Sequence, residues 1–219
     1  MSLRDPRVVA AVRLTTFVAM VGGVVLTAAG PATVTGLLPY FTIQSNVAFG
    51  LFAGWAGVQA WQRGEVSVRP ALKGALTLYI TITGLVYHLV LTNPASGFAV
   101  SDVRRTVPEA IGNQLLHTVV PLLAVLDFLV FDERRRYRWR YAAYWLVFPL
   151  GYQVFVVIRG LIVDRYPYPF NDVAAIGYDG LAATTVVFGL AFWVLGLALV
   201  LADRHPVGPG RPAGVVVPE

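Results

Sequence analysis

Six long apolar runs divide the chain, and short polar connections separate them. The runs cover residues 8–29, 42–61, 71–91, 111–131, 141–163 and 177–202. Each run holds about 20 residues or slightly more, enough for an α-helix to cross roughly 30 Å of hydrocarbon. The pattern therefore predicts an all-α integral membrane protein, in which a bundle of six transmembrane helices forms a single domain over residues 1–204. The remaining segment, 205–219, is rich in proline and glycine, which predicts a flexible tail.

Polar and small residues form a stripe along the second run. Thr42, Asn46, Gly50, Gly54 and Gly57 follow one another at spacings of four, four, four and three residues, which places them on one face of a helix. Glycines on such a face allow a neighbouring helix to approach closely. We therefore expect this face, with Thr42 and Asn46, to point into the bundle rather than toward lipid.

Other polar residues within the runs gather toward the same end of the predicted bundle. The whole set is Thr42, Asn46, His88, Asn113, Gln114, His117, Arg159 and Asp179. Polar side chains are costly in hydrocarbon and usually functional there. Their convergence from several helices predicts a pocket that opens to one side of a membrane. Asp127 lies toward the opposite end, where we expect it to pair with an arginine or to face interior water.

The distribution of basic residues predicts the orientation, because cytoplasmic loops carry an excess of Lys and Arg. Thirteen of the 17 basic residues fall at the end that holds both termini, and the other four fall at the opposite end. Both termini are therefore predicted to be cytoplasmic, and the polar pocket is predicted to open toward the outer leaflet. Tyr166 and Tyr168 are predicted to mark the outer interface.

Composition narrows the classes of function. Charged residues make up 13% of the chain, against about 25% in soluble domains. The chain has no cysteine, which excludes disulfides, thiolate metal sites, iron–sulfur clusters and a cysteine nucleophile. The basic run at 134–140 fits either a nucleic-acid site or a cytoplasmic loop near anionic headgroups, and its place between two apolar runs favours the loop. No nucleic-acid partner is therefore predicted.

Thr42 and His117 are the candidate catalytic residues. A hydroxyl nucleophile needs a base within hydrogen-bond reach, and both residues are predicted to face inward at a comparable depth. Two structural interpretations stay open beside this one. Thr42 follows Leu38-Pro39 closely, where a helix N-cap belongs, and His117 could instead join two helices by a hydrogen bond.

Six further residues are predicted to bind substrate or support the site. They are Asn46, His88, Asn113, Gln114, Arg159 and Asp179. The amides among them could donate to an oxyanion, and Arg159 could hold an anionic group such as a carboxylate. His88 fits a supporting role and a purely structural role equally well.

Two histidines also raise the question of a metal or a haem. A zinc site usually needs three protein ligands, which His88, His117 and Asp179 would just supply. The two histidines could also hold a haem between facing helices. Neither histidine lies in a pairing motif, so no metal and no cofactor is predicted.

Three segments resemble the androgen-induced-gene and androgen-dependent TFPI-regulating protein family. They are residues 113–121 (NQLLHTVVP), 41–43 (FTI) and 166–172 (YPYPFND). Members of that family are multi-pass membrane hydrolases that use a threonine and a histidine to cleave fatty acid esters of hydroxy fatty acids. The resemblance implies Thr42 as nucleophile, His117 as its base, and the bacterial six-pass branch, hence a bacterial inner membrane. Ser45, three residues beyond Thr42, is the alternative hydroxyl.

These expectations converge on a lipid ester hydrolase within the membrane. Its partners would be the bilayer and an amphipathic lipid ester, whereas the sequence does not indicate an oligomeric state. If His117 acts as a neutral base, hydrolysis should fall as the pH drops through a histidine pKa near 6.5. Two alternatives are a non-enzymatic binder or transporter of a small amphipathic molecule, and a haem-binding redox membrane protein.

Overall fold

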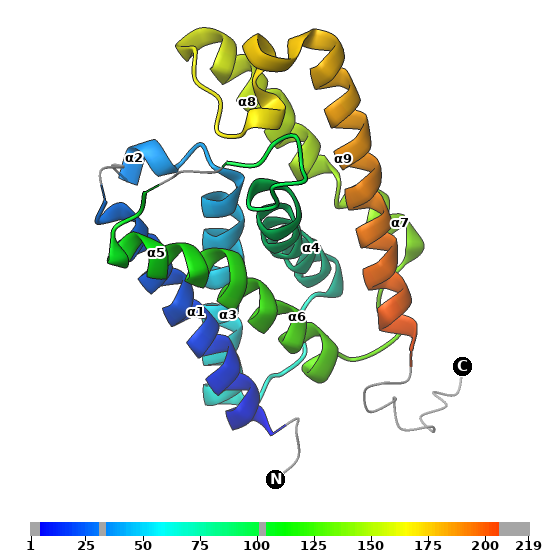
Figure 1. The fold of residues 1–219 in the computed structure, drawn as a ribbon. Helices are drawn as coiled ribbons and strands as arrows, with labels where there is room; N and C mark the ends of the chain where they lie inside the picture. The colour runs from blue at the N-terminus through cyan, green and yellow to red at the C-terminus, as the bar shows by residue number, and fades with distance from the viewer. Residues whose placement is uncertain (1–4, 31–33, 101–103, 206–219) are drawn as a thin grey trace.

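In the computed structural model the described residues are 5–30, 34–100 and 104–205, and every regular element within them is a helix (Figure 1). The long elements are α1 (Pro6–Ala28), α3 (Phe41–Arg63), α4 (Pro70–Val86), α5 (Val107–Gln114), α6 (Val120–Phe131), α8 (Val147–Val163) and α9 (Val173–Arg204). The short elements are α2 (Val34–Leu37), α7 (Trp139–Tyr144), the π-helices η1 (Tyr87–Leu91) and η2 (Leu115–Val119), and the 3-10 helix η3 (Pro169–Asn171). The tail beyond residue 205 lies outside the described residues, so its predicted flexibility stays a prediction.

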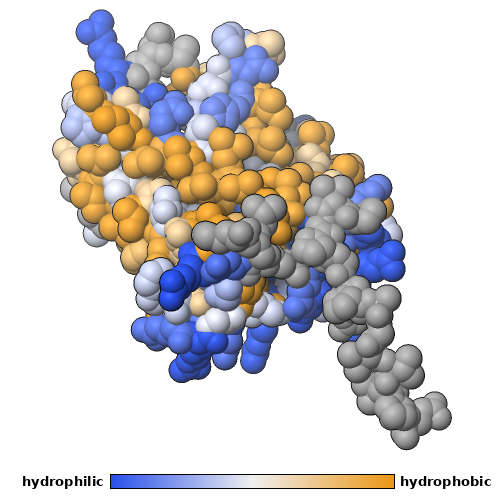
Figure 2. Space-filling model, turned by 90° about the horizontal axis from the view of Figure 1, so that it is seen from below, coloured by the Kyte–Doolittle hydropathy of each residue, from blue (hydrophilic) through white to orange (hydrophobic). Residues whose placement is uncertain are grey.

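Five helical stretches are long and apolar enough to cross a membrane, which makes this an α-helical multi-pass membrane protein. They are Pro6–Ala28, Pro70–Leu91, Val107–Phe131, Trp139–Val163 and Val173–Arg204. Large apolar side chains remain exposed on them, as at Val18, Val147 and Ile162. Figure 2 shows apolar residues spread over the surface between patches of hydrophilic residues. Such a surface suits contact with lipid tails rather than water.

The helix α3 corresponds to the second apolar run, residues 42–61, although it is not among these five stretches. Twelve of its 23 residues are buried, whereas Leu51, Trp55 and Trp61 are exposed, so one face of α3 packs on other helices and the other faces outward. Its glycine stripe packs against α1, as the spacing predicts: a Cβ placed on Gly50 would lie 2.5 Å from Met20, and one on Gly54 would lie 3.0 Å from Phe17. Its polar residues Thr42, Ser45 and Asn46 lie on the buried face, away from the outward face.

The helices form two groups with α4 between them (Figure 1). On one side α1 packs along α3 and against α5, η2 and α6, and on the other side α9 packs against α7 and α8. Gly177 kinks α9 near its start. Its φ of 68° is a backbone conformation that favours glycine. The site described below lies where α8 and α9 meet α3 and α4.

A buried ionic cluster joins α1, α4 and α6 at the end of the bundle where α1 begins. Asp127 lies 3.1 Å from Arg13 Nε and 2.6 Å from Lys73 Nζ, and Lys73 also contacts Asp132. The side chains of Arg13, Lys73 and Asp127 are 1%, 1% and 4% exposed. The predicted pairing of Asp127 with an arginine is thereby confirmed.

Candidate functional site

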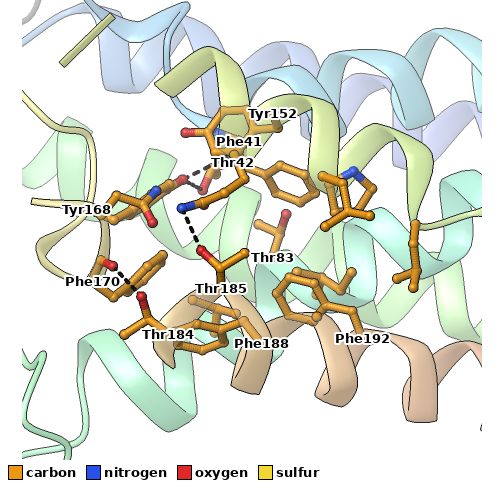
Figure 3. A pocket seen from close by; sticks show the side chains of 18 of the residues that line it. Phe41, Thr42, Thr83, Tyr152, Tyr168, Phe170, Thr184, Thr185, Phe188 and Phe192 are labelled. Atoms are coloured by element: carbon orange, nitrogen blue, oxygen red, sulfur yellow. Dashed lines mark hydrogen bonds between the residues drawn. The ribbon is translucent and has the colours of Figure 1, made fainter. Parts of the chain in front are cut away.

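A cavity of about 740 Å³, including its open mouth, lies among α3, α4, η2, α8 and α9 (Figure 3). Its walls are mostly apolar, and Phe188 and Phe192 of α9 face Phe41 of α3 across it. The polar groups that line it are Thr42, Thr83, His117, Tyr152, Gln153, Tyr168, Asn171, Thr184 and Thr185. The cavity is therefore a mainly hydrophobic chamber into which a few polar groups project.

Thr42 and His117 meet at this cavity. Thr42 is the second residue of α3, and its Oγ1 lies 3.2 Å from Nε2 of His117 in η2. The N-cap interpretation of Thr42 is wrong, because α3 begins at Phe41 and its N-cap is Tyr40. The Thr42 hydroxyl is therefore directed at a histidine rather than at the backbone of its own helix.

The hydrogen bond of His117 Nδ1 determines whether Nε2 donates or accepts. Nδ1 lies 3.0 Å from the backbone oxygen of Asn113, and a carbonyl oxygen can only accept a hydrogen bond. Nδ1 must therefore carry a proton, and in the neutral ring Nε2 is then the acceptor. Thr42 accordingly donates its hydroxyl proton to His117, which is the arrangement that a general base requires.

Tyr168 completes the chain of hydrogen bonds. Its hydroxyl lies 3.2 Å from both Oγ1 and the backbone N of Thr42. The backbone N–H can only donate, and the Thr42 proton is directed at His117, so the Tyr168 O–H donates to Oγ1. Burial raises the pKa of Tyr168, which keeps this hydroxyl protonated. All the protons in the chain therefore point toward His117 and the Asn113 carbonyl.

A second tyrosine stabilises the start of α3. The first backbone N–H groups of α3 have no hydrogen-bond partner within the helix. The N–H of Phe41 donates to the Tyr152 hydroxyl at 3.2 Å, and that hydroxyl donates to the carbonyl of Pro39 at 2.9 Å. Tyr152 and Tyr168 thus replace the side-chain cap that Tyr40 does not supply, and they fix the position of Thr42.

The local shape of the helix around His117 follows from Pro121. Proline has no N–H, and its ring clashes with the carbonyl four residues earlier, which here belongs to His117. The helix widens into the π-helix η2 just before it, and such bulges are frequent at functional sites. Gly84 allows α4 to pack closely there, since a Cβ would lie 3.2 Å from the His117 carbonyl oxygen.

Two of the predicted supporting residues hold this geometry from outside the cavity. Asn46, with no exposed surface, donates to the carbonyl of Thr42 at 2.8 Å and to that of Leu116 at 3.1 Å. It therefore joins the backbones of the two helices that carry Thr42 and His117. The Asn113 side chain donates to the hydroxyl of Tyr87, whose ring stacks on His117 with 4.2 Å between centroids.

His88 and Gln114 lie beside the site but do not line the cavity. Thr118 donates to Gln114 Oε1 at 2.9 Å and lies 3.0 Å from His88 Nε2. Because the threonine has one proton, His88 must donate to it. The ring of Tyr87 contacts both His88 and His117, so it occupies the space that a haem held by the two histidines would need.

Arg159 and Asp179 do not join the other predicted residues. Arg159 lies on α8 and donates to the carbonyl of Arg165 at 3.0 Å, and Asp179 lies exposed on α9 just beyond the kink. Neither lines the cavity, so the expectation that they converge on the pocket is corrected. Depth along a helix was predicted, but the direction in which these helices face was not.

Ser45 is the weaker of the two hydroxyl candidates. Its Oγ lies 2.7 Å from the carbonyl oxygen of Phe41 and 2.7 Å from Thr83 Oγ1, and it does not line the cavity. Thr42 has a histidine acceptor, whereas the partners of Ser45 are a carbonyl and another hydroxyl. Geometry therefore favours Thr42 as nucleophile.

Tyr168, Tyr152 and Asn171 are site residues that the sequence did not indicate. Tyr168 and Asn171 lie in the segment YPYPFND at 166–172, where two prolines restrict the backbone, and this was the available signal. Within the described residues, no group of three or more His, Asp or Glu side chains is placed to hold a metal ion. The chain matches no known family model, no curated protein and no solved structure.

Proposed function

We propose that this protein is an intramembrane lipid ester hydrolase with Thr42 as nucleophile and His117 as general base. One observation carries the proposal: Thr42 Oγ1 lies 3.2 Å from His117 Nε2, while His117 Nδ1 is held by the Asn113 carbonyl. Nucleophile, base and a group that orients the base are the parts of a hydrolytic triad. Here a backbone carbonyl replaces the usual carboxylate.

The reaction would proceed in two steps. Thr42 Oγ1 attacks the ester carbonyl carbon while its proton passes to His117 Nε2. The bond to the leaving oxygen then breaks, and His117 returns the proton to the departing alcohol, which leaves an acyl group on Thr42. Water, deprotonated by His117, then attacks that acyl group. The bond between the acyl carbon and Thr42 Oγ1 breaks, His117 returns the proton to Oγ1, and a carboxylic acid leaves.

The cavity suits the acyl part of such a substrate. Its mostly apolar walls, with a few polar groups among them, are typical of sites that bind small hydrophobic molecules. An ester of a long-chain fatty acid would place its chain between α8 and α9 and its carbonyl at Thr42. Fatty acid esters of hydroxy fatty acids are the substrates that the family resemblance suggests, and Arg159 is not assigned to binding them because it does not line the cavity.

In this proposal α3 is the sixth membrane-spanning helix, and both termini lie in the cytoplasm of a bacterial cell, at its inner membrane. The 23 residues of α3 run beside α1, which is itself long and apolar enough to span. The excess of basic residues at the end with the termini supports the orientation. The cavity would then open toward the outer leaflet, where a lipid substrate can reach it.

A binder or transporter of a small amphipathic molecule is the second candidate, because the same apolar cavity would serve it. The hydrogen-bond chain argues for the hydrolase, since simple binding does not require a hydroxyl to donate to a histidine. The haem-binding alternative is less favoured, because the Tyr87 ring contacts both imidazoles and His117 uses both of its nitrogens.

The direct test is labelling of the detergent-purified protein with a fluorophosphonate probe, followed by mass spectrometry of the adduct. We expect the adduct on Thr42, and we expect it to be lost in Thr42→Ala and His117→Ala. Ser45→Ala is the matched control, because it removes a neighbouring hydroxyl of α3 and should leave labelling intact. Absence of Thr42 labelling in a well-folded wild-type sample would contradict the proposal and favour the binder.

A further inference from the structure

Asn171 presents an unpaired amide within the same cavity. It is the last residue of η3, it lines the cavity, and it is 1% exposed. Among the residues that the structure describes, its Nδ2 has no hydrogen-bond partner. Buried side-chain donors are nearly always paired, so an unpaired one calls for an explanation. A group that arrives with the substrate would supply the missing acceptor.

The fold places this amide in the same loop turn as the tyrosine that contacts the nucleophile. The backbone N–H of Asn171 donates to the carbonyl of Tyr168 at 3.1 Å, which closes one tight turn. Tyr168 directly precedes η3 and Asn171 ends it, so both side chains come from the same short turn. The turn is also held by Thr184 of α9, which donates to the Phe170 carbonyl at 3.0 Å (Figure 3). These two hydrogen bonds therefore fix the position of Asn171.

The other amides near Thr42 are already engaged. Asn46 donates to two carbonyls, Asn113 donates to Tyr87, and Gln153, the other amide that lines the cavity, donates to Thr185 at 3.2 Å. Among the described cavity-lining amides, Asn171 is the one whose Nδ2 makes no hydrogen bond at all, so both of its N–H groups are available to a ligand. An ester brings one strong acceptor to Thr42, its carbonyl oxygen, which becomes negatively charged when the hydroxyl attacks.

We propose that the Asn171 amide donates a hydrogen bond to the carbonyl oxygen of the ester and stabilises the oxyanion that forms on it. Tyr168 is the second donor: when Oγ1 bonds to the carbonyl carbon, the Tyr168 O–H turns from Oγ1 to the oxyanion. Asn171 forms no covalent bond and transfers no proton. This inference rests on the proposed hydrolase function, and it replaces the earlier candidates Asn46, Asn113 and Gln114 in this role.

The test compares Asn171→Leu with the wild type in hydrolysis of a p-nitrophenyl decanoate ester. Loss of one oxyanion donor lowers kcat by about 10²- to 10³-fold. We expect that loss with KM changed by less than about threefold, because the interaction strengthens only in the transition state. The rate at which the fluorophosphonate labels Thr42 should fall as well, because its phosphoryl oxygen occupies the same position.

A thermal melt separates this role from a structural one. Replacing an unpaired buried amide by an apolar side chain of similar size should keep or raise the melting temperature. A structural role predicts the opposite, a lower melting temperature with kcat preserved in the folded fraction. Asn93→Leu is the matched control, since that amide donates to the Leu89 carbonyl outside the cavity, and it should leave kcat unchanged.

The outcomes distinguish this inference from the proposed function. Thr42-dependent hydrolysis with kcat of Asn171→Leu within threefold of the wild type would overturn the role of Asn171 and leave the hydrolase standing. No Thr42-dependent hydrolysis or labelling in the wild type would overturn both. If Asn171→Leu does not fold, Asn171→Asp, which keeps the shape but removes the N–H donors, decides the question by the same criterion.

Discussion

The protein contains two buried polar regions at opposite ends of its bundle, and they are built differently. Around Asp127, Arg13 and Lys73, opposite charges pair directly and the partners come from three helices. Around Thr42 and His117, the groups are neutral and form a directed chain of hydrogen bonds that borders an apolar cavity. One region satisfies its charges mainly by direct pairing, and the other leaves the Asn171 amide nitrogen without a partner among the described residues, beside an apolar cavity.

The difference separates a structural role from a chemical one. Buried charges must be paired, and breaking such a pair leaves an uncompensated charge, so the ionic cluster stabilises the packing of α1, α4 and α6. A neutral hydroxyl that donates to a histidine gains little stability from the contact but becomes a stronger nucleophile. We therefore expect mutations in the first region to lower stability and mutations in the second to lower activity.

The largest expected effect is on hydrolysis. Thr42→Ala and His117→Ala should each lower kcat/KM by at least about 10⁴-fold, because nucleophile and base act as a unit. Their melting temperatures should stay close to that of the wild type. The double variant should be no slower than the slower single variant, and additive losses in an ester hydrolysis assay would contradict a shared step.

The reverse result is expected for the ionic cluster. Asp127→Asn leaves Arg13 and Lys73 buried with less compensation, which should lower the free energy of unfolding by about 3–5 kcal/mol. Denaturant unfolding in detergent would measure it, with Glu133→Gln as the control, because the Glu133–Arg136 pair lies at the surface, 43% and 36% exposed. Hydrolysis per folded molecule should change little. A loss of kcat comparable to that of Thr42→Ala would show that the two regions are coupled.

The helices could be predicted from the sequence because long apolar runs and the glycine stripe act locally. Thr42 and His117 could be predicted as a pair because both are polar residues at similar depth within such runs. Arg159 and Asp179 could not be placed, since depth does not reveal which way α8 faces or where Gly177 kinks α9. Tyr168 and Asn171 lie in a loop, whose path depends on tertiary contacts such as that of Thr184 with Phe170.

A smaller loss of activity is expected at Tyr168. Tyr168→Phe removes the donor to Thr42 Oγ1 and to the oxyanion but keeps the ring that stacks on Phe170 with 5.1 Å between centroids. We expect kcat to fall by about 10- to 100-fold, less than for the nucleophile itself. Tyr166→Phe, in the same loop, is the matched control because its hydroxyl does not line the cavity. Equal effects of the two variants would point to a loop distortion instead.

The smallest expected effect lies on the alkaline side of the pH profile. Burial raises the pKa of Tyr168 above its ordinary value of 10.0, so its O–H donor stays in place as the pH rises to that value and would be lost only beyond it. Hydrolysis should therefore change by less than about twofold between about pH 7.5 and 9.5. Toward acid it should fall, because protonation of His117 removes the acceptor for the Thr42 proton. A decline in the alkaline range that disappears in Tyr168→Phe would mean that Tyr168 ionises there, and its hydroxyl could then not serve as a donor at the site.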